Sequence, residues 1–210
     1  MSTQVFLVRH GETTWNLAGK LQGHLESRLT ATGIAQAQAL AEHLQHQPFA
    51  AVYSSDLKRA YQTAQYIVNK NQHTIIKKPS LRERNLGIFQ GLTRELLCAR
   101  FPEAFQAYQT QPQFIIPQGE SLQGFHQRCI TCLEEIAACH LGQSILIVSH
   151  GGVLTALLKH TLSIPLVTPR RFDIANTSVN IFSYTQTHWT LRVWGSLTHW
   201  SLEEQVLASE

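Results

Sequence analysis

Residues 5–11 read VFLVRHG, and residues 145–151 repeat the pattern as ILIVSHG. In both stretches four aliphatic or aromatic residues precede a polar residue, a histidine and a glycine. Such continuous apolar runs are typical of strands that are covered on both faces of a parallel sheet. Because the carboxyl ends of parallel strands meet at one edge, we expect His10 and His150 to lie together there.

The chain between these two stretches alternates between predicted helices and strands. Thr30 can cap a helix whose apolar residues recur at helical spacing as far as Leu44. Residues 50–53 predict a short strand, and residues 74–76 predict another. A helix between them has its cap at residues 54–56 and this apolar face: Leu57, Ala60, Ala64, Ile67 and Val68. This alternation predicts a mostly parallel sheet with helices on both faces.

The segment from residue 78 to residue 119 breaks this alternation. It contains prolines at positions 79, 102, 112 and 117, with only short helical pieces between them. Ser121 then opens a long amphipathic helix, and residues 179–184 and 189–193 predict a hairpin at a sheet edge. We therefore expect one α/β domain over residues 1–210, a three-layer sandwich with a small helical cap inserted at about residues 78–119.

The composition excludes several classes of protein. The 210 residues are 43% hydrophobic and 15% charged, which suits a globular chain. The net charge of +3 is spread along the sequence, which argues against a nucleic-acid surface. No apolar run approaches the roughly 20 residues of a membrane span, and residues 1–4 begin no secretory signal. We expect a cytoplasmic protein without membrane or nucleic-acid partners. The sequence leaves the oligomeric state open and is compatible with a homodimer.

The four cysteines predict free thiols. A domain of this size has its own hydrophobic core and needs no disulfides. Cys129 and Cys132 lie on the apolar stripe of the long predicted helix, so we expect them in the core rather than on a metal.

Two adjacent histidines could form a metal pair, a general acid and base, or a nucleophile with a helper. Arg9 precedes the first histidine, and Asn16 lies in the loop that follows. Arg59 falls in the first turn of a predicted helix, where the helix dipole disfavours a cation, so we expect an anionic partner. Arginines and an amide donor suit a phosphate dianion and would repel a divalent cation. The sequence therefore favours phosphoryl chemistry without a metal or cofactor.

Four motifs now give a specific resemblance. They are VRHGET at residues 8–13 with Asn16 after it, YSSDLKRA at 53–60, ERNLG at 83–87 and SHGG at 149–152. In this order they cover nearly the whole chain and resemble the histidine phosphatase superfamily, also called the phosphoglycerate mutase-like family. Within it, the chain looks most like the small bacterial-type broad-specificity phosphatases.

This resemblance implies roles for individual residues. His10 would attack phosphorus and become a phosphohistidine, while Arg9, Arg59 and His150 would hold the phosphoryl oxygens. Glu83 would be the proton donor, although the sequence also places Glu12, Glu103 and Glu120 in or near the site region. Further phosphate or substrate contacts are expected from Asn16, Gln22, Gly23 and Gly151.

The implied activity is metal-independent hydrolysis of small phosphomonoesters. Two alternatives stay open: a cofactor-dependent phosphoglycerate mutase, and a catalytically idle protein that binds a phosphorylated ligand. Residues 86–119 contain only Arg94 and Arg100 as cations, which predicts a modestly charged lid suited to uncharged or aromatic leaving groups. A mutase would need extra basic anchors and an enclosed pocket, so we expect a phosphatase. The sequence does not name the physiological substrate.

Overall fold

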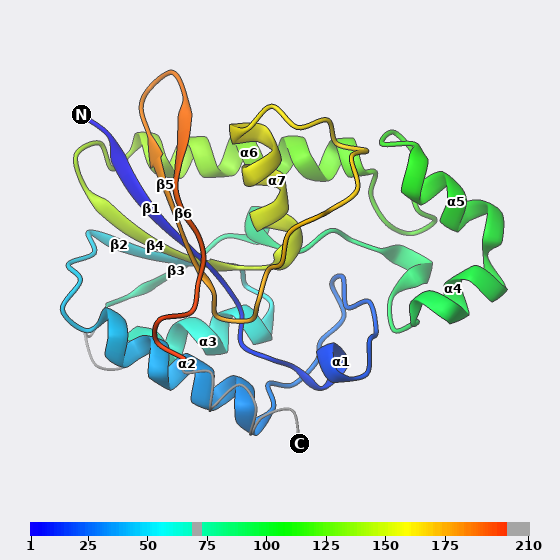
Figure 1. The fold of residues 1–210 in the computed structure, drawn as a ribbon, viewed down its shortest axis with the longest axis horizontal. Helices are drawn as coiled ribbons and strands as arrows, with labels where there is room; N and C mark the ends of the chain where they lie inside the picture. Colours follow the sequence, from blue (N-terminus) through cyan, green and yellow to red (C-terminus); the bar gives the residue numbers. More distant parts are fainter. Residues whose placement is uncertain (69–72, 201–210) are drawn as a thin grey trace.

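A computed structural model describes residues 1–68 and 73–200 of the chain (Figure 1). The strands are β1 (Thr3–Arg9), β2 (Ala51–Ser54), β3 (Ile75–Lys77), β4 (Ser144–Ser149), β5 (Val179–Tyr184) and β6 (Trp189–Ser196). The helices are α1 (Thr14–Leu17), α2 (Ala31–Leu44), α3 (Lys58–Val68), α4 (Arg94–Arg100), α5 (Pro102–Thr110), α6 (Leu122–Ala138) and α7 (Gly151–Thr161). Two short 3₁₀ helices, η1 (Pro79–Leu81) and η2 (Gly87–Phe89), complete the elements.

The strands form one sheet in the order β3-β2-β4-β1-β5-β6. β1 and β2 both run parallel to β4, and β3 runs parallel to β2, whereas β5 and β6 are antiparallel. Arg9 pairs with Ser149 at the last position of the β1–β4 register. The residues that follow, His10 and His150, therefore leave the sheet at the same edge. This confirms the predicted α/β architecture.

Side chains of the central strands alternate between two cores. Val5 and Leu7 pack with α6 and α7 on one face of the sheet. Phe6 and Val8 pack with α2 and α3 on the other face. Successive strand residues point to opposite faces, so an apolar run fills both layers. Figure 1 shows α6 and α7 on one side of the sheet and α2 and α3 on the other. Cys129 and Cys132 are buried in the first core, and the cysteines of the described residues are free thiols, as predicted.

The loop that follows β1 packs closely against the start of α2. Thr30 caps α2 by accepting a hydrogen bond from the N–H of Gly33. A Cβ on Gly33 would lie 2.1 Å from the carbonyl oxygen of Glu12, and one on Gly11 would lie 2.5 Å from that of Gly33. Only glycine at both positions lets this loop press its backbone against the start of α2.

The segment between β3 and α6 carries α4 and α5 to one side of the sheet (Figure 1). It has its own small core, made of Leu86, Phe89, Leu97, Phe105 and Ile116. Arg94 lies over the ring of Phe105 rather than over the site. This separate core explains why the segment can extend beyond the sheet while staying folded.

The hairpin at the sheet edge departs in detail from its sequence pattern. β6 extends to Ser196, and two register shifts interrupt its pairing with β5. The strict alternation of residues 189–193 does not become alternating burial. Trp194, within β6, packs edge to face against Phe172. None of the helices in residues 1–68 and 73–200 has the length and apolar character needed to cross a membrane.

Candidate active site

His10 lies directly after β1 and is almost fully buried. Its Nδ1 is 2.8 Å from the carbonyl oxygen of Gly11. A carbonyl oxygen can only accept, so Nδ1 carries the proton and Nε2 keeps its lone pair. Burial, together with the positive charges of Arg59 and Arg9, holds the pKa of His10 well below 6.5. The imidazole is therefore neutral near pH 7, with a free nitrogen nucleophile.

His150 lies with its ring centroid 5.3 Å from that of His10. Its Nε2 is 2.8 Å from the hydroxyl oxygen of Ser55, and this oxygen accepts a hydrogen bond from the N–H of Leu57. The Ser55 hydroxyl can then donate to Nε2, which leaves the proton of a neutral His150 on Nδ1. Burial and the positive charge of Arg59 lower the pKa of His150 well below 6.5. Nδ1 is buried without a partner among the described residues, so it is an available donor.

Arg9 and Arg59 bring positive charge to the two histidines. Arg9 donates through Nη1 to the carbonyl of Ile174, and Arg59 donates to the carbonyls of Leu25, at 3.0 Å, and Gly23, at 2.7 Å. In both guanidinium groups Nε is buried and meets no acceptor within the described part of the chain. Burial lowers the pKa of Arg9 to about 10 and also lowers that of Arg59. Buried cations with unused N–H donors form a site for an anion.

Glu83 faces this cationic group and is the only carboxylate among the described residues lining the pocket. Its Oε1 accepts from the backbone N–H of Arg84 at 2.8 Å, and its Oε2 accepts from that of Gly152 at 2.9 Å. A Cβ at position 152 would lie 2.0 Å from Oε1, so the second glycine of the SHGG motif makes room for this carboxyl.

The other candidate carboxylates lie outside the pocket lining. Glu12 accepts a hydrogen bond from the hydroxyl of Thr30. Glu120 pairs with Arg128 at 2.6 Å, and Glu103 lies in the first turn of α5. Geometry therefore favours Glu83 over these three for contact with a bound substrate.

The remaining sequence-predicted residues all line the same pocket: Asn16, Gln22, Gly23 and Gly151. The side-chain oxygen of Asn16 accepts from the N–H and the hydroxyl of Thr13 and from Nδ2 of Asn176. Three donors on its oxygen leave the Asn16 amide nitrogen available as a donor to a ligand.

Sequence reasoning missed Asn176, Ser55 and several pocket cations. Asn176 also donates to the backbone carbonyl of His10 at 2.8 Å, so it joins the two pocket residues His10 and Asn16. Its segment crosses the end of β1, where the N–H of Thr177 donates to the carbonyl of Arg9. No local motif marks position 176. Ser55, in contrast, lies inside the YSSDLKRA motif, and its hydroxyl is a signal for a hydrogen-bond partner of a histidine.

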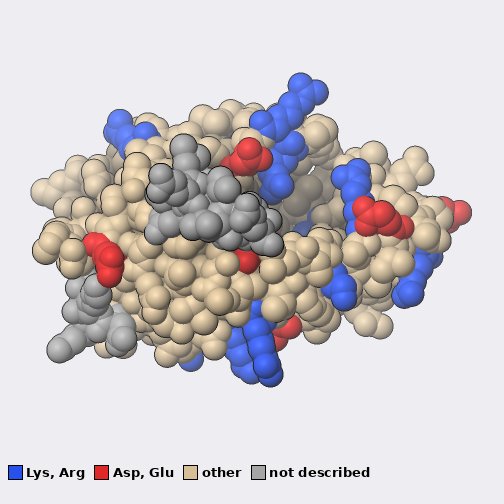
Figure 2. Space-filling model, turned by 60° about the horizontal axis from the view of Figure 1, so that its bottom comes forward, with Lys and Arg blue, Asp and Glu red and all other residues tan. Residues whose placement is uncertain are grey.

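The pocket has a volume of about 350 Å³ and opens at the surface, with Lys and Arg side chains around the hollow (Figure 2). The cations beyond Arg9 and Arg59 come from outside residues 86–119: Lys20, Arg84, Lys159 and Arg170. Arg94 and Arg100 do not line it. The prediction of a modestly charged lid concerned residues 86–119 alone, and the positive charge of the pocket comes from other segments of the chain. In residues 1–68 and 73–200 no three His, Cys, Asp or Glu side chains gather as a metal-binding group.

We expect the free energy of unfolding of the His10→Asn variant to depend less steeply on pH below about 6.5 than that of the wild type. In the unfolded chain His10 titrates near 6.5, whereas its folded pKa lies well below that value. Below about pH 6.5 the unfolded state therefore binds more protons, and the free energy of unfolding falls as the pH falls. Removing one such histidine should reduce this slope by up to about 1.4 kcal/mol per pH unit. Urea unfolding at several acidic pH values measures it. His46→Asn, at an exposed position, is the control, and equal slopes in both variants would contradict the burial argument.

Comparisons with known proteins agree with this geometry. The sequence profile of the histidine phosphatase superfamily (branch 1) matches residues 5–197. Phosphoglycerate mutase-like protein 4 of Arabidopsis thaliana is 42% identical over 207 residues, covering 96% of this chain and 87% of that protein. The metal-independent phosphoserine phosphatase of the same plant is 40% identical over 205 residues, covering 95% and 84%.

A solved structure gives the same result for the fold. The alpha-ribazole phosphatase from Shigella flexneri superposes with a TM-score of 0.82 at 33% identity, covering 92% of this chain and 96% of that one. Profile, relatives and fold all confirm the resemblance carried by the four motifs. The chain belongs to the histidine phosphatase superfamily.

Proposed function

We propose that the protein hydrolyses small phosphomonoesters through a phosphohistidine formed on His10, without a metal ion. One observation carries this proposal: the free Nε2 of a neutral imidazole adjoins buried N–H donors that lack partners among the described residues. A neutral imidazole is a competent nucleophile, and a phosphate dianion would use these donors. The name of the metal-independent phosphoserine phosphatase also supports it.

The proposed reaction has two displacements. In the first, Nε2 of His10 forms a bond to phosphorus as the bond to the ester oxygen breaks, and Glu83 gives a proton to the leaving alkoxide. In the second, Glu83 takes a proton from water, which attacks phosphorus and releases phosphate and free His10. Arg9, Arg59 and His150 would offset the charge on the phosphoryl oxygens in both steps. A positioned acid and base typically contributes about 10²- to 10⁴-fold.

Phosphoglycerate mutase activity is the second candidate. Cations beyond those needed for one phosphate line the pocket, and one relative is named phosphoglycerate mutase-like. Hydrolysis remains the better proposal because the pocket opens at the surface (Figure 2), where water can reach a phosphohistidine. Idle binding is the weakest candidate, since it gives no reason for a free Nε2 on a neutral His10 beside Glu83.

A direct assay distinguishes these candidates. Purified protein is incubated with p-nitrophenyl phosphate and a panel of phosphomonoesters, and separately with 3-phosphoglycerate plus a bisphosphoglycerate primer. We expect phosphate release to exceed interconversion of 2- and 3-phosphoglycerate. Primer-dependent isomerisation faster than hydrolysis of every tested ester would favour the mutase, and binding without turnover would favour an idle protein.

We expect dialysis against a chelator to leave the hydrolysis rate unchanged. Arginines and histidines would already supply the positive charge and N–H donors that a metal would otherwise provide. The rate with p-nitrophenyl phosphate is compared before and after dialysis against EDTA. If dialysis lowers the hydrolysis rate and added zinc or magnesium restores that rate, the interpretation of the histidines as a metal pair would be favoured instead.

A further inference from the structure

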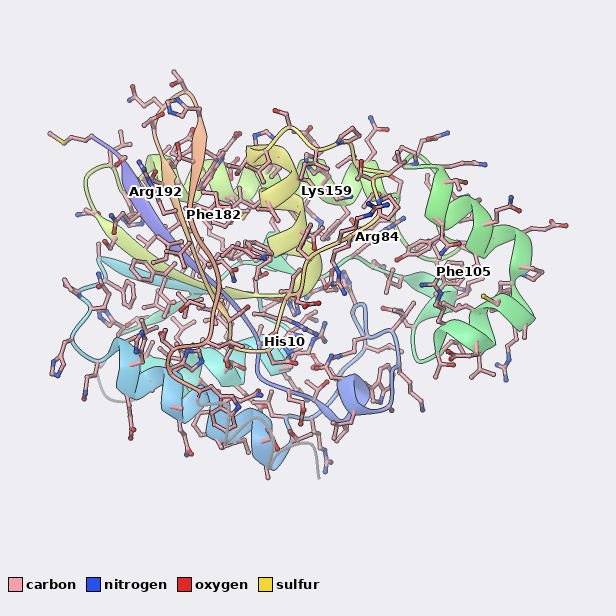
Figure 3. The ribbon with its side chains drawn as sticks, viewed as in Figure 1. His10, Arg84, Phe105, Lys159, Phe182 and Arg192 are labelled. Atoms are coloured by element: carbon pink, nitrogen blue, oxygen red, sulfur yellow. The ribbon has the colours of Figure 1, made fainter. Side chains whose placement is uncertain are left out.

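The chain that leads into β5 contacts the end of β1 at three points. The carbonyl of Ile174 accepts from Nη1 of Arg9, and the N–H of Thr177 donates to the carbonyl of Arg9 at 3.0 Å. Nδ2 of Asn176 donates to the carbonyl of His10 at 2.8 Å. In Figure 3, His10 lies where β1 ends, beside the chain that leads into β5. This short segment therefore holds both the arginine and the histidine at the end of β1.

The backbone of this segment is strained next to Asn176. Thr177 has a φ of 56°, in the left-handed region. A residue with a branched side chain is rarely found there, because its Cβ crowds the backbone. Thr177 is fully buried, and its hydroxyl donates to the carbonyl of Asn176 at 2.8 Å. Strained conformations of this kind persist where the surrounding contacts hold them, and they cluster at functional sites.

The hydrogen bonds around Asn176 have one possible direction. The N–H of Thr13 can only donate, so the side-chain atom of Asn16 that lies 3.1 Å from it is the oxygen. The side-chain atom of Asn176 that faces this oxygen, at 3.4 Å, and also faces the carbonyl of His10 is then the amide nitrogen. One NH₂ group supplies both bonds, with one hydrogen for each. The amide nitrogen of Asn16 is left as a donor at the pocket, which Asn16 lines.

The same NH₂ group holds the peptide between His10 and Gly11. The carbonyl of this peptide accepts from Asn176, and its N–H donates to the hydroxyl of Thr63 at 3.0 Å. Gly11 has no side chain to restrict its backbone, so these two bonds help to set where its own carbonyl lies. That carbonyl accepts from Nδ1 of His10 and orients the ring. Loss of the Asn176 bond should therefore loosen the orientation of the imidazole.

We propose that Asn176 is a positioning residue, which holds the His10 ring and the Asn16 amide nitrogen in the orientation that a phosphoryl group requires. Asn176 is not itself among the described residues that line the pocket, so it would act through these two residues. The inference rests on the proposed phosphatase function, in which His10 attacks phosphorus. A misplacement of about 1 Å in an active site can cost about 10²-fold in rate, which is large enough to measure.

The test replaces the amide of Asn176 with side chains that cannot donate. Asn176→Leu keeps a branched side chain of similar size, and Asn176→Ala removes it. For each variant, kcat/KM is measured with p-nitrophenyl phosphate, together with the inhibition constant of orthovanadate, which resembles the five-coordinate phosphorus of the transition state. We expect both variants to lower kcat/KM, and to raise the vanadate constant, by about tenfold or more. The vanadate constant does not depend on the fraction of active protein, so a merely structural loss would leave it unchanged.

A second comparison asks whether Asn176 acts through Asn16. Asn176→Leu is also made in an Asn16→Ala protein, in which one of its two targets is gone. We expect a smaller loss of kcat/KM there than in the wild type, because the effects of residues that act together do not add. Asn180→Ala is the matched control, since Asn180 donates to the carbonyl of Leu7 in β1 at 3.2 Å and neither residue lines the pocket. It should lower the melting temperature and keep the wild-type vanadate constant.

Separate outcomes would overturn the positioning role and the proposed function. If the wild type hydrolyses p-nitrophenyl phosphate and a folded Asn176→Leu variant keeps the wild-type vanadate constant, the positioning role is wrong. If circular dichroism shows that neither Asn176 variant folds, the amide serves the fold rather than the site, and the role is wrong as well. Equal losses in the wild-type and Asn16→Ala backgrounds would show that Asn176 does not act through Asn16. If the wild type hydrolyses no monoester, the proposed function fails together with the positioning role.

Discussion

His10→Ala is expected to abolish measurable turnover, with a loss of about 10⁴-fold or more, while the protein still folds. The variant removes the proposed nucleophile. The His10 side chain makes one hydrogen bond, to the adjacent Gly11 carbonyl, so its loss leaves β1 paired on both sides. Incubation with a radiolabelled phosphomonoester, followed by rapid denaturation, should trap a labelled protein in the wild type and none in the variant.

The chemistry of the label makes this experiment specific. A phosphohistidine is labile in acid and stable in base, whereas phosphoserine and phosphothreonine behave in the opposite way. His46→Ala, at an exposed position after α2, serves as the control and should be labelled like the wild type. Full activity in His10→Ala would end the phosphohistidine proposal. A stable label in that variant would assign the nucleophile to another residue.

The fold could be predicted from the sequence because its two central strands have the same recognisable pattern. The runs at residues 5–8 and 145–148 are apolar at every position, which is typical of a strand covered on both faces, and all eight residues are buried. Both runs end in a histidine followed by a glycine, and parallel pairing in register then places His10 and His150 5.3 Å apart. Caps at Thr30 and Ser121 fixed two helix starts within one residue, because a side-chain oxygen that satisfies an N–H is a local signal.

The contacts of the site that could not be predicted from the sequence join segments that lie far apart in the chain. Ser55 contacts Nε2 of His150 across 95 residues, and Asn176 reaches the backbone carbonyl of His10 across 166. Neither contact follows from spacing, since each arises where loops from different strands meet at the sheet edge. Arg170 escaped for the same reason, because a loop after α7 brings it to a pocket that the lid composition alone could not describe.

Hydrogen bonds to the backbone hold two of the buried pocket arginines in place. Arg59 and Arg84 are both buried, and both spend two donors on backbone carbonyls. Those bonds fix each guanidinium before any substrate arrives, so little side-chain entropy is lost on binding. Arg59 also retains a buried Nε that meets no acceptor among the described residues, and its positive charge lowers the pKa of both His10 and His150. The guanidinium of Arg59 is therefore held in place before a phosphate group would bind.

Arg59→Ala is expected to lower kcat/KM by about 10²-fold or more, since removing a charged donor of this kind typically costs about 2.7 to 4 kcal/mol. The structure gives this residue two tasks. Its Nε lies unpartnered in the site, and its Nη atoms hold the carbonyls of Gly23 and Leu25 in the loop that also carries Gln22. Steady-state kinetics with p-nitrophenyl phosphate measures the loss.

Two further variants separate charge from loop anchoring and test the assignment of Arg59. Lys58→Ala is the matched control, because the exposed Lys58 contacts Glu26 through its backbone N–H, which the substitution keeps. It should retain wild-type kinetics. Arg59→Lys keeps the charge but lacks the planar fork of the guanidinium, which holds two carbonyls while Nε stays free of them, so it should recover only part of the loss. If Lys58→Ala and Arg59→Ala behave alike, Arg59 does not contact the phosphate, and its burial at the start of α3 must serve the loop alone.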